Sequence, residues 1–419
     1  MANLLSEEQL RKMCEDAAAL GFRPERLMNL DRQLRGWIEQ RKVSQGIVVK
    51  VVRHNQTAFE AAYGQKGAGE EEGPLTVDTI YPLCSQTKPI TAALICIMQE
   101  EGLLDLTQRV RPHFPRLVCD TDSDIRLWQL LTHTSGLHDG DMWGYIDVFI
   151  KEKLEMAVPE EGAPDEVWDE ICLRARERME LPAMPAGKEM RQDTFEAIRF
   201  SAPLTRKPHT EMIYAGAGYY ILGKLISKIS GKTIDEYAQE KLFGPLGMTD
   251  SYWNLPEEKN DRYYRRSSRH DGWRWLNDRA RYNESGDNGI KSTVTDMCRF
   301  TQMFLNRGEL DGVRIVSPAT VDMMLTNYNA KLPDSFFNSE WLSPAWGLGW
   351  NIRCGKIDDA GMIRSDRSFQ HGGFGGSMIT GDPDRDVAIA YFGTHPTENP
   401  DWNWSGAHVN NMVLGAIDD

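Results

Sequence analysis

The sequence predicts a mixed α/β (α+β) fold, in which helices flank an antiparallel sheet built from both ends of the chain. Two β-branched runs carry this prediction, at 47–52 and 387–392, because Val and Ile fit a pleated strand. Between about residue 90 and residue 284 the apolar spacing is helical and strand patterns are rare. Strands at both ends with helices between them indicate a single sheet and an all-helical domain inserted into it.

The domain boundaries follow from this change of pattern. We expect a discontinuous sheet domain over residues 1–90 and 285–419, and a mainly helical domain over 91–284. The helical domain contains a long acidic segment at 138–193, rich in aromatic residues and methionine. An insertion of this length is consistent with a lid or pocket wall, and equally with a peripheral pair of helices.

The elements are expected in a definite order along the chain. Gly21 ends a first amphipathic helix and Pro24 opens a second, a normal stop-and-start pair. The remaining elements are a strand at 47–52, a turn at 55–56, a strand at 58–63, helices at 90–101, 125–131, 166–180 and 293–305, a strand beginning at 346–352, a strand–turn–strand at 368–379, a strand at 387–392 and a closing helix at 407–417.

Composition excludes several classes of function. A net charge of −14 argues against a nucleic-acid binder, and no apolar run is long enough to span a membrane. The seven cysteines are scattered without CxxC or metal-ligand spacing, and no signal peptide is visible. We therefore expect a cytoplasmic protein with reduced thiols and with no metal or cofactor. The oligomeric state is left open.

A Ser-x-x-Lys stretch at 85–88 is the first candidate for chemistry. Residues three apart share a helix face, so Ser85 and Lys88 should point the same way at the mouth of an apolar helix. Burial and the positive helix end lower a lysine pKa, and a neutral amine next to a hydroxyl makes the hydroxyl a nucleophile. The alternative is an ordinary N-cap serine beside a solvated lysine, because short motifs often match by chance.

Two further elements stand in order behind this stretch: Tyr214, which opens an apolar helix, and a His-Gly-Gly at 371–373 on a late strand. Together they resemble the serine β-lactamase and penicillin-binding-protein superfamily, with the class C β-lactamases and the family VIII carboxylesterases most similar. The resemblance runs from about residue 25 to the end of the chain. It includes the segments 78–81, 85–92, 130–137, 245–248, 289–293, 347–350 and 371–373.

The resemblance implies a β-lactamase-like fold and a set of roles. Ser85 would attack an acyl carbonyl and form an acyl-enzyme, with Lys88 and Tyr214 taking its proton. The oxyanion hole would consist of the backbone N–H groups of Ser85 and Phe374. His371, together with Gly372, Gly373 and Gly216, would contact the substrate. His133 is expected to be a hydrogen-bonded core histidine in a structural turn.

Two departures from the family pattern bear on the substrate. The family's Tyr-x-Asn ends here in Gly216, which has no side chain to bond an acyl amide. The family's Lys-Thr-Gly begins here with His371, which is largely neutral at pH 7 and would not grip a carboxylate. Both departures disfavour β-lactams and peptides and are compatible with neutral esters.

We therefore expect a serine hydrolase, most simply a carboxylesterase acting on small or aromatic esters. The alternatives are an amidase (for a D-amino-acid amide or similar), a β-lactamase or DD-peptidase, an acyltransferase with an alcohol acceptor, and a non-catalytic ligand-binding member. Tryptophans are candidates for the pocket wall, with core filling as the plainer interpretation. They are Trp273, Trp275, Trp346, Trp350, Trp402 and Trp404.

Overall fold

The computed structural model describes residues 5–67, 73–117, 124–160, 162–265, 285–333, 344–393 and 405–419. The chain divides into two compact units, which are described separately. The first comprises Met1–Leu104, Tyr219–Lys331 and Phe337–Asp419, and the second comprises Asp105–Gly218 and Leu332–Phe336. The first unit combines both chain ends. It also includes residues 91–104 and 219–284, which the sequence pattern assigns to the helical domain.

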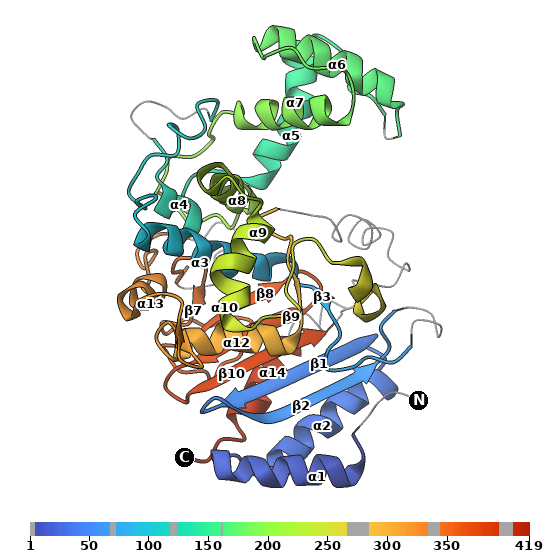
Figure 1. Ribbon diagram of the computed structural model, residues 1–419, viewed down its shortest axis with the longest axis vertical. Coiled ribbons are helices and arrows are strands. Elements are labelled where there is room, and N and C mark those ends of the chain that lie inside the picture. The colour runs from blue at the N-terminus through green and yellow to red at the C-terminus, as the bar shows by residue number, and fades with distance from the viewer. Residues whose placement is uncertain are drawn as a thin grey trace. The chain divides into compact units, whose positions relative to one another are not determined.

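Among the described residues of the first unit, six strands form one antiparallel sheet in the order β2–β1–β10–β9–β8–β7 (Figure 1). The adjacent strands β1 and β10 come from opposite ends of the chain, which confirms the predicted sheet. The strands are β1 (Gly46–Arg53), β2 (Gln56–Gly64), β7 (Asn351–Ile352), β8 (Phe369–Gly373), β9 (Ser377–Asp382) and β10 (Val387–Gly393).

Helices cover both faces of this sheet. On one face, α1 (Glu7–Asp16), α2 (Pro24–Glu39) and α14 (Ser405–Leu414) bury the alternate apolar side chains of β1, β2 and β10. On the other face lies α12 (Val294–Leu305), whose Thr295 accepts a hydrogen bond from Lys50 at 3.3 Å. Figure 1 shows these two layers of helix around the strands. Period-two alternation along β1 is what allows each face to be buried separately.

The other elements of the first unit surround the sheet. They are β3 (Tyr81–Pro82), paired with β4 (Lys291–Ser292); β5 (Glu309–Leu310), paired with β6 (Val313–Arg314); and the helices α3 (Thr87–Glu100), α9 (Ile234–Ala238), α10 (Gly244–Leu246) and α13 (Pro318–Met324).

The second unit is helical in its described residues. Its helices α5, α6 and α7 pack around Phe149, Ala175 and Ile198. The helix α8 begins in this unit and continues into the first. The bounds are α4 (Leu127–Leu131), α5 (Asp139–Lys153), α6 (Asp165–Arg178), α7 (Lys188–Phe200) and α8 (Gly216–Ser230).

Two local predictions are wrong. The first hairpin turns at His54 and Asn55, not at 55–56, because both residues adopt left-handed φ angles of 52° and 59° that suit a two-residue hairpin. The segment 346–350 is a turn and not the start of a strand. The amide of Gly347 donates to the carbonyl of Trp350 at 2.8 Å, and only Asn351–Ile352 pair with β8.

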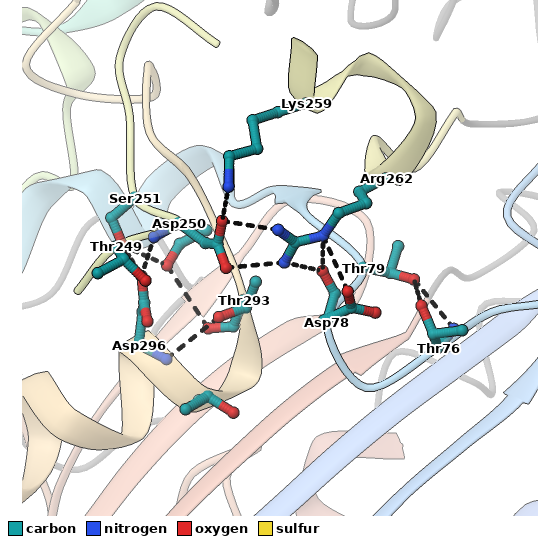
Figure 2. A network of polar contacts seen from close by, with 12 residues as sticks. Thr76, Asp78, Thr79, Thr249, Asp250, Ser251, Lys259, Arg262, Thr293 and Asp296 are labelled. Carbon is teal, nitrogen blue, oxygen red and sulfur yellow. Dashed lines mark hydrogen bonds and ion pairs between the residues drawn. The ribbon is translucent and has the colours of Figure 1, made fainter. Parts of the chain in front are cut away.

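A network of ion pairs and hydrogen bonds holds in place the segment at Asp78, which leads to β3 and Ser85 (Figure 2). The guanidinium of Arg262 contacts both carboxylate oxygens of Asp250, at 2.8 and 2.7 Å, and donates to the backbone carbonyl of Asp78. Next to it, the carboxylate of Asp296 on α12 accepts the N–H of Asp250 and the hydroxyl of Ser251, each at 2.8 Å. The network therefore joins three segments that are distant in sequence, and it occupies the Arg262 side chain.

Replacing Arg262 with Ala should lower the free energy of unfolding by about 1–3 kcal/mol, because charged hydrogen bonds to Asp250 and Asp78 are lost together. Urea denaturation measures this loss. The control is Arg307→Ala, which breaks an ion pair whose side chains are 54% and 60% exposed and should leave the midpoint almost unchanged. Equal midpoints for the two variants would contradict the structural role of Arg262.

Candidate active site

Ser85 lies in a single tight turn directly before α3. The turn is a 3₁₀ segment, Cys84–Gln86, and Ser85 is partly exposed whereas its two neighbours are buried. Cys84 has a left-handed φ of 49°, which a non-glycine residue seldom adopts. Strained backbone of this kind persists where the surrounding structure holds it, and it is frequent at functional sites. The turn thus presents the Ser85 hydroxyl while its flanks stay in the core.

Lys88 lies one turn further along, and its amine reaches back to the serine. Its Nζ lies 3.1 Å from Oγ of Ser85 and 3.0 Å from the backbone carbonyl of Asp287. The side chain is only 2% exposed, and the ring of Tyr219 lies 5.8 Å from Nζ. The structure therefore brings Ser85 and Lys88 within proton-transfer distance, as the three-residue spacing predicts. This contact removes the alternative of a solvated lysine.

The segment that supplies the Asp287 carbonyl is held by residues of α3 itself. Thr91 donates its hydroxyl to the carbonyl of Gly286 at 2.8 Å, and the hydroxyl of Thr87 accepts the N–H of Ile290 at 3.0 Å. The carbonyl of Ile290 in turn accepts the N–H of Leu83 at 3.0 Å. The lysine's backbone acceptor is thus fixed relative to the helix that carries the lysine.

His371 on β8 is buried near Lys88 and is neutral. Its Nδ1 lies 2.7 Å from the carbonyl of Gly372, and because a carbonyl only accepts, the ring proton is on Nδ1 and the lone pair is on Nε2. Burial first, and then the charge of Lys88, lower the pKa of His371 from 6.5 to about 3. Trp346 packs against the imidazole edge-on, with ring centroids 5.7 Å apart. His371 therefore offers this site an acceptor and no positive charge.

The turn after β8 lies against the backbone that precedes Ser85. A Cβ at Gly373 would come within 2.3 Å of the carbonyl oxygen of Leu83, so only glycine allows this close approach. Phe374 follows directly, and its phenyl group is 57% exposed. The two segments that carry the predicted oxyanion donors, the amides of Ser85 and Phe374, are therefore neighbours in the first unit.

Tyr214 and Gly216 belong to the second unit. The ring of Tyr214 packs against the imidazole of His133, with centroids 4.4 Å apart and planes at 33°. His133 is 2% exposed and accepts the N–H of Ala215 on Nδ1, at 3.1 Å, which confirms a hydrogen-bonded core histidine. The amide of Gly216 donates to the carboxylate of Asp139. Sequence reasoning missed Asp139, because its carboxylate caps a helix that begins 77 residues further along the chain.

The remaining candidates divide clearly. Trp350 is fully buried among Phe300, Phe304 and Phe369, so it fills the core. Trp346 faces His371, whereas the other four tryptophan candidates lie outside the described residues. Within the described ranges, no cluster of His, Cys, Asp and Glu is arranged to hold a metal ion. In the same part of the chain, no helix has the length and hydrophobicity needed to cross a bilayer.

A family model described as Beta-lactamase matches residues 34–404. The chain belongs to the Beta-lactamase family. Members of this family are serine hydrolases, among them esterases and carboxypeptidases, so the resemblance inferred from the motifs is confirmed. A protein of Mycobacterium tuberculosis described as uncharacterized is 27% identical over 77% of this chain and 79% of its own length. An Escherichia coli protein provisionally named a D-alanyl-D-alanine carboxypeptidase is 24% identical over 90% of this chain and 84% of its own length.

Solved structures agree on the fold of this Beta-lactamase family member. EstCE1, described as a hydrolase with promiscuous acyltransferase activity, superposes with a TM-score of 0.66 at 18% identity, covering 96% of this chain and 99% of its own. A family VIII carboxylesterase gives 0.65 at 19% identity, covering 97% and 96%. At these identities the likeness shows the β-lactamase-like fold and leaves the substrate undecided.

His371 should make stability depend on pH in a defined direction. Between pH 6.5 and about 3 the unfolded state binds a proton at this residue and the native state does not. Stability is therefore lost as the pH falls through this window, by at most about 1.4 kcal/mol per pH unit, and the contribution is constant above it. Urea denaturation of the wild type and of His371→Asn from pH 7.5 to 4 measures the difference, and parallel curves would contradict the assignment.

Proposed function

We propose that the protein is a carboxylesterase that cleaves small neutral esters, including aromatic ones, through an acyl-enzyme at Ser85. The contact between Ser85 and Lys88 carries the proposal. Attack of Oγ on the ester carbonyl forms the new C–O bond, while the hydroxyl proton passes to whichever of Lys88 and Tyr214 is deprotonated. Collapse of the intermediate breaks the bond to the alcohol, which leaves with that proton. Water then hydrolyses the acyl-serine.

Residues of the predicted site support a neutral ester over an anionic substrate. A substrate carboxylate would need a cation in place of His371, and this imidazole is buried and neutral. Gly216 provides no side-chain partner for an acyl amide, and its own N–H is bound to Asp139. The exposed phenyl group of Phe374, beside the predicted oxyanion hole, favours apolar or aromatic acyl or alcohol groups. The similarity to a family VIII carboxylesterase points the same way.

Amide hydrolysis and acyl transfer remain the alternative functions. The E. coli relative's provisional name supports a carboxypeptidase, and the description of EstCE1 supports an alcohol acceptor in place of water. The loss of the asparagine at Gly216 also favours acyl transfer, because that side chain helps water approach the acyl-enzyme in the family pattern. An acyl-binding protein without turnover would be labelled at Ser85 and release nothing.

Hydrolysis of a chromogenic phenyl ester tests the proposed function. Ser85→Ala, Lys88→Ala and Tyr214→Phe should each lower kcat/KM by at least about a hundredfold, because each removes a group that makes or moves the bond or proton. The exposed Lys12→Ala on α1 is the matched surface control and should behave as the wild type. Full activity of Ser85→Ala would refute the proposal. Faster turnover of a D-amino-acid amide or a cephalosporin than of the ester would favour the amidase or β-lactamase alternative.

The substrate preference has its own test at His371. His371→Lys should lower KM for an ester that bears a carboxylate by about tenfold relative to its neutral methyl ester, because an ammonium group can pair with that charge. The comparison is made in parallel with His371→Asn, which places no charge there and should not change the ratio. An unchanged ratio in both variants would mean that residue 371 does not set the preference.

A further inference from the structure

The backbone that follows Tyr214 is bound by side chains at three consecutive amides. The N–H of Ala215 donates to Nδ1 of His133 at 3.1 Å, the N–H of Gly216 to Oδ2 of Asp139 at 2.9 Å, and the N–H of Ala217 to Oδ1 of the same carboxylate at 2.7 Å. All five residues lie in the second unit. These amides open α8, where N–H groups have no partner within the helix. Two side chains thus satisfy all three.

One of these two side chains, that of His133, also contacts Tyr214 itself. The imidazole of His133 packs on the phenol ring, while its Nδ1 holds the amide one residue later. Because Nδ1 accepts, this histidine is neutral, with its proton on Nε2. A backbone contact runs in the opposite direction: the N–H of Ile213 donates to the carbonyl of His133 at 2.9 Å. The chain is therefore held to His133 on both sides of the tyrosine.

Asp139 lies where two helix ends favour a negative charge. It is the first residue of α5, and its carboxylate binds the first amides of α8. Each helix N-terminus has the character of a partial positive charge, and a carboxylate at that point is stabilised by it. The carboxylate also occupies the amide of Gly216, the position where the family pattern has an asparagine. A ligand would have to displace Asp139 to use these donors.

We propose that Asp139 and His133 are positioning residues that set the direction of the Tyr214 hydroxyl for its part in acylation and deacylation. The inference rests on the proposed function, in which Tyr214 shares the Ser85 proton with Lys88. The position of a tyrosine ring is set by two torsions, χ1 and χ2, so fixing the backbone on both sides and packing His133 against the ring leaves it little freedom. Small displacements of such a group are costly in rate, since proton transfer requires hydrogen-bond distance.

A cycle of substitutions separates this role from a general effect on folding. Asp139→Ala should lower kcat for the phenyl ester by about tenfold or more in the wild-type background, while KM changes little. In the Tyr214→Phe background the same substitution should have no further effect on kcat, because the hydroxyl that it positions is already absent. His133→Asn, which keeps an acceptor near Nδ1 and tolerates the left-handed φ of 59°, should retain more activity than His133→Ala.

The neighbouring acid on α5 is the matched control. Asp141 contacts Thr205 and Arg206 and touches none of the three amides, so Asp141→Ala should keep the wild-type kcat. Thermal unfolding of every variant shows whether it is folded, and Asp139→Asn, which keeps one acceptor oxygen, serves if Asp139→Ala does not fold.

Three outcomes decide the matter. A loss of kcat in the wild-type background, without a loss in the Tyr214→Phe background, supports positioning through Tyr214. Equal losses in both backgrounds, or no loss in either, overturn it. If Tyr214→Phe alone has full activity, the proposed role of Tyr214 fails, and the positioning role fails with it. This failure of the Tyr214 role can be distinguished from a failure of positioning alone, because it appears in a variant in which Asp139 is unchanged.

Discussion

The candidate site depends on one buried amine. Lys88 is almost entirely removed from solvent, with its Nζ between the Ser85 hydroxyl and the Asp287 carbonyl. Charging a buried amine costs a large desolvation free energy. The groups around the amine therefore determine whether it is protonated or neutral. The threonines of α3 fix the Asp287 segment, and the tight turn at Cys84 fixes Ser85. These contacts therefore hold Nζ of Lys88, Oγ of Ser85 and the carbonyl oxygen of Asp287 at hydrogen-bond distance.

Burial, together with the neighbouring Lys88, also explains the character of His371. Desolvation first, and then repulsion by a cation at Lys88, lower the pKa of the imidazole, which keeps a lone pair at Nε2. In the proposed mechanism, the site combines a nucleophile and its base with an uncharged acceptor at His371. A neutral His371 would disfavour an anionic substrate, because no cation there would compensate the negative charge. In the proposed function, the chemistry therefore depends on Ser85 and Lys88, and the substrate preference on His371.

The sequence predicted the parts of this arrangement that are local. Ser85 and Lys88 share a helix face at fixed spacing, and the β-branched runs of β1 and β10 identify two adjacent strands of the sheet. The sequence did not predict the backbone groups of the site, above all the Asp287 carbonyl, because a backbone carbonyl has no side-chain pattern. Long-range contacts escaped as well, because neither the ion pair of Arg262 nor the capping role of Asp139 is visible without the fold. The strand expected from residue 346 begins only at Asn351, because the segment before it forms a turn in which Gly349 has a left-handed φ of 84°.

The covalent intermediate is the central claim, and mass spectrometry tests it most directly. The protein is mixed with a slowly hydrolysed aryl ester, quenched in acid within milliseconds to seconds and digested, and the peptide containing Ser85 is weighed. The account predicts that this peptide gains the mass of the acyl group, that the gain appears before steady-state product release, and that Ser85→Ala abolishes it. Turnover of the ester with no acyl mass on Ser85 at any time would contradict it.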